Sequence, residues 1–338
     1  MMDLNILWFI LITVLFTGFF FLEGFDYGVG GILPFLSSDE KERGEVLRTI
    51  TPVWDGNEVW MITAGGALFA AFPHVYATMF STFYLALFLM LVALILRGVA
   101  FDLRGRQQSA CWQRFWDGAI CFGSIVPAFL WGVAVTNLIA GIPINEKMIY
   151  TGGFFDLLTP YTIVGGLAFL FVFLFHGTAF LTLRLAKSSL IMRCQQLALK
   201  TGVTASIFFV LCMAMTLTYT DLFTKPLAAV ALVGAALFFV MAILSMKLAK
   251  GKASFLLSTA AIVATTIAFF AGLFPRLMVS SLNPDWSLTI TNAASSPHTL
   301  SVMTIAAAVF VPIVLIYQSW SYYIFRKRVT PKDAEEHY

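Results

Sequence analysis

The chain has 338 residues, of which 59% are hydrophobic and only 12% are charged, and its formal net charge is +3. A water-soluble protein carries about a quarter of its residues as charged side chains. The composition therefore excludes a soluble globular protein and indicates an integral membrane protein. A net charge this small gives no indication of nucleic-acid binding.

Apolar runs long enough to cross the roughly 30 Å hydrocarbon layer predict nine transmembrane helices. In chain order they cover residues 6–36, 51–72, 75–103, 115–140, 158–184, 196–222, 224–249, 254–279 and 300–327. The predicted fold class is an all-α integral membrane protein with one polytopic domain over residues 1–338. A helix over 6–36 would be about 46 Å long. We expect its end to tilt, protrude or break, near the glycines of 28–31 and Pro34.

The basic residues alternate between the connections. The first, third, fifth and seventh connections, with the C-terminal tail, hold 17 of the 21 lysines and arginines. The opposite connections hold only Lys147, Lys225 and Arg276, and Arg97 lies within a predicted helix. By the positive-inside rule, the N-terminus lies outside and the C-terminus lies in the cytoplasm.

Two pairs of carboxylates interrupt apolar segments, Glu23 with Asp26 and Asp55 with Glu58. Each pair has i, i+3 spacing, which places both side chains on one helix face. Ionisable residues within a membrane are costly and normally mark a pathway or a partner. The predicted topology places both pairs near the cytoplasmic boundary, so they would line one inlet and relay protons.

The motif WDGNEVW adds Trp54, Asn57 and Trp60 to the second pair. An amide between carboxylates would help to pass protons through water, and the tryptophans would wall the site. The alternative is an interfacial aromatic belt in which the acids reach solvent. Asp55 fits that alternative better than Glu58, which lies deeper.

Arg97 lies about two turns inside its predicted helix and needs a counter-ion, for which Glu23, Asp26 and Glu58 are the candidates. A structural ion pair and an influence on the carboxylates both remain open. His176 is the one histidine within a predicted span. A lone buried histidine is typically hydrogen-bonded to a neighbouring helix, so we do not expect it to bind haem. The four cysteines lack the spacing of a metal site, and no metal site is predicted.

Five segments together resemble subunit II of the cytochrome bd-type quinol oxidases. They are FFLEGFDYGVG (20–30), TPVWDGNEVWMITAGGALFAAFP (51–73), LRGVAFDLR (96–104), FHGTAFL (175–181) and NPDWSLTITNAASSP (283–297). WDGNEVW followed by GGALFAAFP is the most specific of these, and the resemblance extends over nearly the whole chain.

The resemblance implies two four-helix bundles plus a peripheral helix, and a heterodimer with a subunit I that binds haem b and haem d. That complex oxidises quinol, reduces dioxygen to water and generates proton-motive force in the bacterial cell membrane. The chain would be a subunit of this oxidoreductase and not catalytic alone. By this resemblance, Asp55 and Glu58 fall in the motif linked to proton entry, and Asp26 is the matching acid of the first helix. Glu23 would join them on the proton path, and Trp60, with Trp54 and Asn57, would lie near haem d or an oxygen path.

Another class of protein also needs intramembrane carboxylates, namely the proton-coupled secondary transporters. These would show inverted repeats and interrupted helices near the midplane, whereas the acids here gather on one side. The sequence leaves open whether the substrate is menaquinol or ubiquinol. It also leaves open whether a small third subunit is present.

Overall fold

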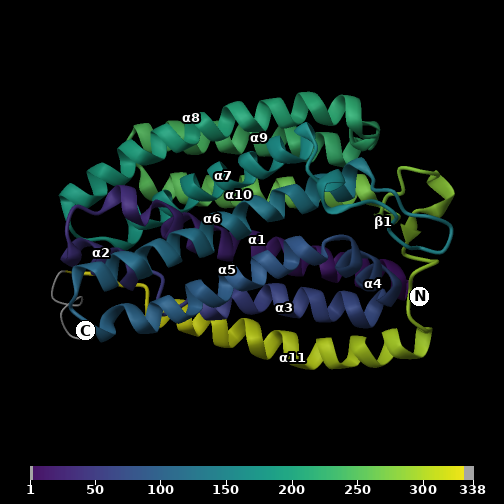
Figure 1. Ribbon diagram of the computed structural model, residues 1–338, viewed down its shortest axis with the longest axis horizontal. Helices are drawn as coiled ribbons and strands as arrows, with labels where there is room; N and C mark the ends of the chain where they lie inside the picture. The colour runs from purple at the N-terminus through teal and green to yellow at the C-terminus, as the bar shows by residue number, and fades with distance from the viewer. Residues whose placement is uncertain (1–2, 331–338) are drawn as a thin grey trace.

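The structure is a computed structural model, and it describes residues 3–330. Long helices lie side by side along one axis, and the first helix begins at the opposite end of the molecule from the end of the last one (Figure 1). The helices are α1 Leu4–Leu36, α2 Glu40–Arg48, α3 Trp54–Ala71, α4 Pro73–Thr82, α5 Tyr84–Leu103, α6 Ala110–Ala140, α7 Pro160–Arg184, α8 Ser188–Tyr219, α9 Pro226–Lys247, α10 Gly251–Leu273 and α11 Pro297–Ile324. The prediction of an all-α membrane protein is confirmed.

One small antiparallel sheet joins β1, Arg276–Met278, to β2, Leu288–Thr289. The sheet lies at the end of the molecule where the chain begins, which we call the β end (Figure 1). The opposite end holds α2, the 3-10 helix η1 at Arg104–Arg106, and the residues that follow α11, and we call it the α2 end.

Eight of the helices are long and apolar enough to cross a membrane: α1, α5 to α10 and α11. The remaining predicted span, 51–72, corresponds to α3, whose first turns carry Asp55, Asn57 and Glu58. These polar residues lower the hydropathy of an 18-residue helix, although α3 lies alongside α1 and α11 (Figure 1). The count of nine spans and the division into bundles therefore stay predictions.

The prediction of one helix over 75–103 was wrong. The chain forms α4 and then α5, with Phe83 between them outside the helical conformation. Both helices are apolar and no glycine or proline stands at the junction. Hydropathy therefore gave no sign of the interruption.

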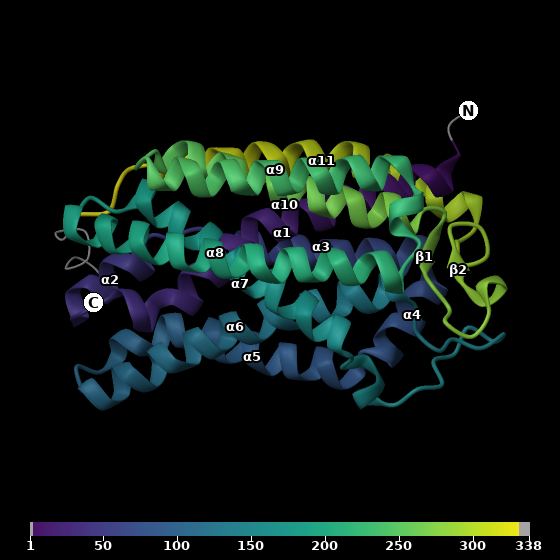
Figure 2. The same cartoon turned by 90° about the horizontal axis from the view of Figure 1, so that it is seen from above.

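Helix α1 continues without a break to Leu36, so a break near its glycines is ruled out. It lies near the middle of the molecule, between α9 and α11 on one side and α5 and α6 on the other (Figure 2). The glycines allow neighbouring helices to approach closely. A Cβ on Gly28 would lie 1.9 Å from the carbonyl oxygen of Phe173, and one on Gly30 would lie 2.0 Å from Ser124 Oγ.

Ion pairs hold the α2 end together. Glu42 of α2 accepts hydrogen bonds from Arg193 at 2.5 Å and from Lys187 at 2.9 Å. Arg104 pairs with Asp117 of α6 and with Glu40 of α2, each at 2.6 Å. Basic residues from several predicted cytoplasmic connections thus meet at one end of the molecule, as the charge pattern requires.

Candidate functional site

A buried ion pair joins α1 to α5. The Arg97 guanidinium donates to the Glu23 carboxylate, and both side chains are fully buried. Gly123 of α6 makes room for this arginine, because a Cβ there would lie 2.5 Å from Arg97 Cβ. The guanidinium carbon lies 4.9 Å from the ring centroid of Tyr27, within the range of a cation–π contact. Of the three candidate counter-ions, Glu23 is the one that forms the salt bridge.

The second acid of α1 is held by α3. Asn57 Nδ2 donates to Asp26 Oδ2 at 2.6 Å, and both residues are buried. Because α3 begins at Trp54, Asn57 lies in its first turn and faces α1, where a carboxylate needs a donor. The predicted amide of WDGNEVW therefore bonds directly to the predicted acid of the first helix.

Helix α11 completes this hydrogen-bonded network. Tyr322 donates its hydroxyl to Asn57 Oδ1 at 2.7 Å, and Gln318 Nε2 donates to the same oxygen at 3.3 Å. Trp60 Nε1 donates to Gln318 Oε1 at 2.8 Å. The amide of Asn57 is thus fixed in orientation, with its NH₂ group directed at Asp26.

Sequence reasoning missed Gln318 and Tyr322. Both lie in the segment YQSWSYY at the end of α11, among other uncharged polar side chains, and neither carries a charge that would demand a partner. Their i, i+4 spacing placed them on one face of α11, which was the only available signal.

The two acids of α3 are more exposed than the two acids of α1. Glu58 is half-buried, Asp55 is exposed, and neither makes a hydrogen bond or ion pair within residues 3–330. Glu58 is near enough to Glu23, Asp26 and Arg97 to interact with them electrostatically. The structure therefore brings Glu23, Asp26, Asn57, Glu58 and Arg97 together and leaves Asp55 at the edge of the group.

Free acceptor positions remain inside this cluster. Glu23 Oε2 and Asp26 Oδ1 are buried and have no hydrogen-bond partner in the described part of the chain. Buried carboxylate oxygens usually have a partner. Two carboxylate oxygens without a partner therefore lie close to the half-buried Glu58.

Comparison with known proteins identifies the family. The family model for cytochrome bd terminal oxidase subunit II matches residues 4–325. The chain belongs to this family. It is 41% identical to cytochrome bd ubiquinol oxidase subunit 2 of Bacillus subtilis over 98% of this chain and 99% of that protein. It is 34% identical to cytochrome bd-I ubiquinol oxidase subunit 2 of Escherichia coli K12, over 98% and 97%.

A solved structure shares the fold. The bd oxidase structure from Geobacillus thermodenitrificans contains a chain that matches 96% of this chain and 97% of its own length, with a TM-score of 0.74 and 16% identity. As a bd oxidase subunit II, the chain is a multi-pass protein of the bacterial cytoplasmic membrane and part of a haem-containing oxidoreductase complex with a partner subunit. The family match also decides against the secondary transporter.

The three histidines within residues 3–330 of this bd oxidase subunit do not fit haem ligation. His176 is fully buried, but its Nδ1 is hydrogen-bonded to Ser258 Oγ at 2.7 Å and its Nε2 to the Phe21 carbonyl at 3.0 Å. The prediction that it bonds to neighbouring helices is confirmed. His74 and His298 are exposed at the first turns of α4 and α11. Within residues 3–330, no three His, Cys, Asp or Glu side chains cluster as a metal site would require.

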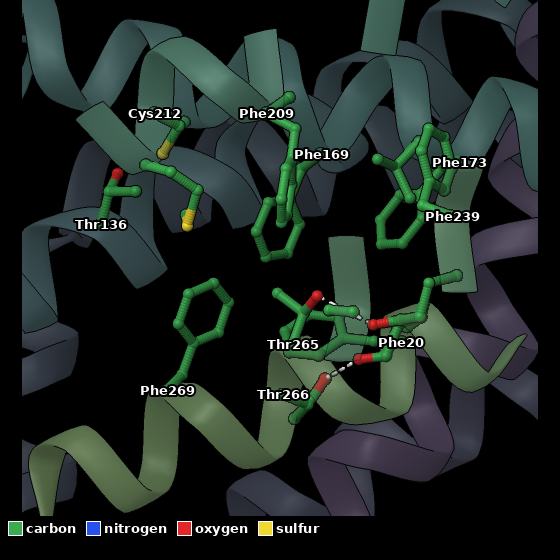
Figure 3. A pocket seen from close by; sticks show the side chains of 17 residues that line it. Phe20, Thr136, Phe169, Phe173, Phe209, Cys212, Phe239, Thr265, Thr266 and Phe269 are labelled. Carbon is green, nitrogen blue, oxygen red and sulfur yellow. Dashed lines mark hydrogen bonds between the residues drawn. The ribbon is translucent and has the colours of Figure 1, made fainter. Parts of the chain in front are cut away.

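An apolar cavity lies apart from the carboxylates, among α1 and α6 to α10. Phenylalanine rings, including Phe20, Phe169 and Phe239, surround it (Figure 3). The hydroxyls of Thr265 and Thr266 on its wall donate to carbonyls of their own helix, at 2.8 and 2.9 Å, and leave the space apolar. None of the predicted proton-path residues lines this cavity.

Proposed function

We propose that this chain supplies a proton-uptake path to a quinol-oxidising, dioxygen-reducing complex whose haems b and d are held by subunit I. The relatives' names specify ubiquinol, and we extend quinol as the substrate class to this complex. Protons would enter at the α2 end, which the positive-inside rule assigns to the cytoplasm. Uptake there would contribute to proton-motive force.

The observation that carries the proposal is the gradient of burial among the acids. Asp55 is exposed at the start of α3, Glu58 is half-buried one turn further along, and Asp26 is fully buried on α1. A proton can pass between such groups through hydrogen-bonded water, because a carboxyl group accepts hydrogen bonds when ionised and donates one when protonated. Asn57 and Arg97 hold the inner carboxylates in place.

The same gradient supports a position for subunit I. An ionised side chain facing lipid within the membrane costs about 2.5–3.5 kcal/mol or more, so the side of α3 that carries Asp55 and Glu58 needs a protein or water neighbour. Along α11, Leu300 is the one buried residue. We therefore place subunit I against α3 and α11.

Neutral isosteres test this path. In the assembled complex, Glu58→Gln should lower quinol-driven oxygen consumption at least about tenfold. Asp55→Asn should lower it less, because Asp55 lies at the outer edge of the group, where water can take its place. Haem absorption should stay at the wild-type level in both. Glu146→Gln, which removes an exposed acid at the β end, serves as the matched control. Normal turnover in Glu58→Gln would refute the path, and loss of haem would show that Glu58 is structural.

A further inference from the structure

The α2 end contains a polar cleft of about 620 Å³ that plays no part in the proposed proton path. Five basic side chains and one acidic side chain line it. They are Arg48 of α2, Asp102 of α5, Arg106 of η1, Arg184 of α7, and Lys327 and Arg328 after α11. Segments far apart in the sequence therefore bring an excess of positive charge to one place.

Four of these basic side chains differ from their neighbours in having no acidic partner in the described part of the chain. Arg43, Arg104, Lys187 and Arg193, at the same end, are all paired with carboxylates. Arg48, Arg106, Lys327 and Arg328 form no ion pair within residues 3–330. Arg184 is anchored by a hydrogen bond from Nη1 to the Lys327 carbonyl, and its buried Nε has no hydrogen-bond partner among the described residues.

Guanidinium groups bind phosphate oxygens through paired N–H donors, and arginine is therefore common at sites that recognise phosphate. The cleft also has an apolar side, formed by Phe101, Ile324 and Phe325. Ile324 and Phe325 are 48% and 45% exposed at the end of α11. An anionic group flanked by hydrocarbon matches both parts of this lining.

We propose that the cleft binds a phosphate group, and that an anionic phospholipid headgroup supplies it, with its acyl chains against Ile324 and Phe325. Basic pockets between helices at the cytoplasmic side of a membrane bind such headgroups. The proposal is independent of the proton path, because none of the carboxylates of α1 and α3 lines the cleft.

The test uses the purified complex with its haems, stripped of lipid in detergent. Binding of dioleoyl phosphatidylglycerol and of dioleoyl phosphatidylcholine is compared by native mass spectrometry, and inorganic phosphate is titrated separately by calorimetry. The cleft variants are Arg48→Gln/Arg106→Gln and, in case that one fails to assemble, Lys327→Gln/Arg328→Gln. The control is Arg114→Gln/Lys200→Gln, which removes two exposed charges from α6 and α8 that do not line the cleft.

We expect phosphatidylglycerol to bind in preference to phosphatidylcholine, and its affinity to fall about fivefold for each basic residue removed from the cleft. The control should retain the wild-type preference, and haem absorption should be unchanged in all three. If inorganic phosphate binds and is lost in the cleft variants while the two lipids bind equally, the site takes free phosphate instead. If the cleft variants match the wild type, or the control weakens binding equally, the proposal is overturned.

Discussion

Among single residues, Glu23 and Arg97 are the most tightly constrained. Both are fully buried and neutralise each other across α1 and α5. Removing one member of such a pair leaves an unpaired charge, which costs about 3–5 kcal/mol, whereas replacing both can cost little. Stability therefore depends on keeping or replacing both side chains together.

Glu23→Gln should accordingly reduce the amount of assembled complex and lower its melting temperature, because Arg97 is left buried without its counter-ion. The double variant Glu23→Gln/Arg97→Met should recover much of the loss. Yield of haem-containing complex and thermal unfolding in detergent measure both effects. Equal losses in the single and double variants would show that the ion pair itself is not the cause.

Glu42 provides a prediction about pH. Burial alone would raise the pKa of Glu42, but hydrogen bonds from Arg193, the Ser38 amide and Lys187 outweigh burial and hold the pKa at about 2. Because the folded-state pKa lies below the ordinary value near 4.5, the bonds stabilise the protein above pH 4.5. That stability is lost as the pH falls toward 2.

Glu42→Gln should therefore destabilise the complex by about 2 kcal/mol at neutral pH. The difference from wild type should shrink between pH 4.5 and 2. Thermal unfolding across this pH range gives the measurement. Glu40→Gln is the control, because the Glu40 side chain is 42% exposed and its partner Arg104 would still pair with Asp117. The Glu40→Gln substitution should destabilise the complex by less than about 1 kcal/mol. A gap that stays constant with pH would contradict the assignment.

Among the elements, α1 owes its close packing against neighbouring helices to its glycines. Gly28 of α1 meets Gly177 of α7 backbone to backbone, since a Cβ on Gly177 would lie 2.5 Å from the Gly28 carbonyl carbon. Gly28 is two residues from Asp26, about half a helical turn, so the spacing of the helices and the position of the acid are linked.

Gly28→Ala should push α7 away from α1 and sharply reduce the amount of assembled complex, because backbone atoms cannot yield as a flexible side chain can. Gly234→Ala in α9 is the matched control, since nothing lies within 4 Å of the added Cβ. Purified yield and haem content report the difference. Comparable behaviour of the two variants would disprove close packing at Gly28.

Hydropathy predicted an element's end well where a long apolar run stopped at a charge, as at Arg184. Hydropathy failed where packing between helices, and not the local sequence, determined the structure. The junction at Phe83 has apolar residues on both sides, and the glycines of α1 serve packing rather than a break. At the site, Glu23, Asp26 and Arg97 could be predicted because buried charges are costly, while the neutral Gln318 and Tyr322 carried no comparable signal.

At the scale of the whole molecule, the two ends differ in charge. The α2 end gathers the ion pairs around Glu42 and Arg104 and the basic cleft, while the β end holds the small sheet and the ion pair between Arg276 and Asp221. The acids of α3 begin at the α2 end, and Asp26 lies about 15 Å from the end of α1 there. A proton path that starts at this end therefore needs only a short series of groups.

The most direct test is proton uptake by the assembled oxidase in liposomes during a single reaction of the reduced enzyme with dioxygen, followed with a pH indicator at the α2 side. We predict that Asp26→Asn slows this uptake at least about tenfold while the haem spectrum and the rate of quinol binding stay unchanged. Uptake at the wild-type rate in Asp26→Asn, with the complex fully assembled, would contradict the account.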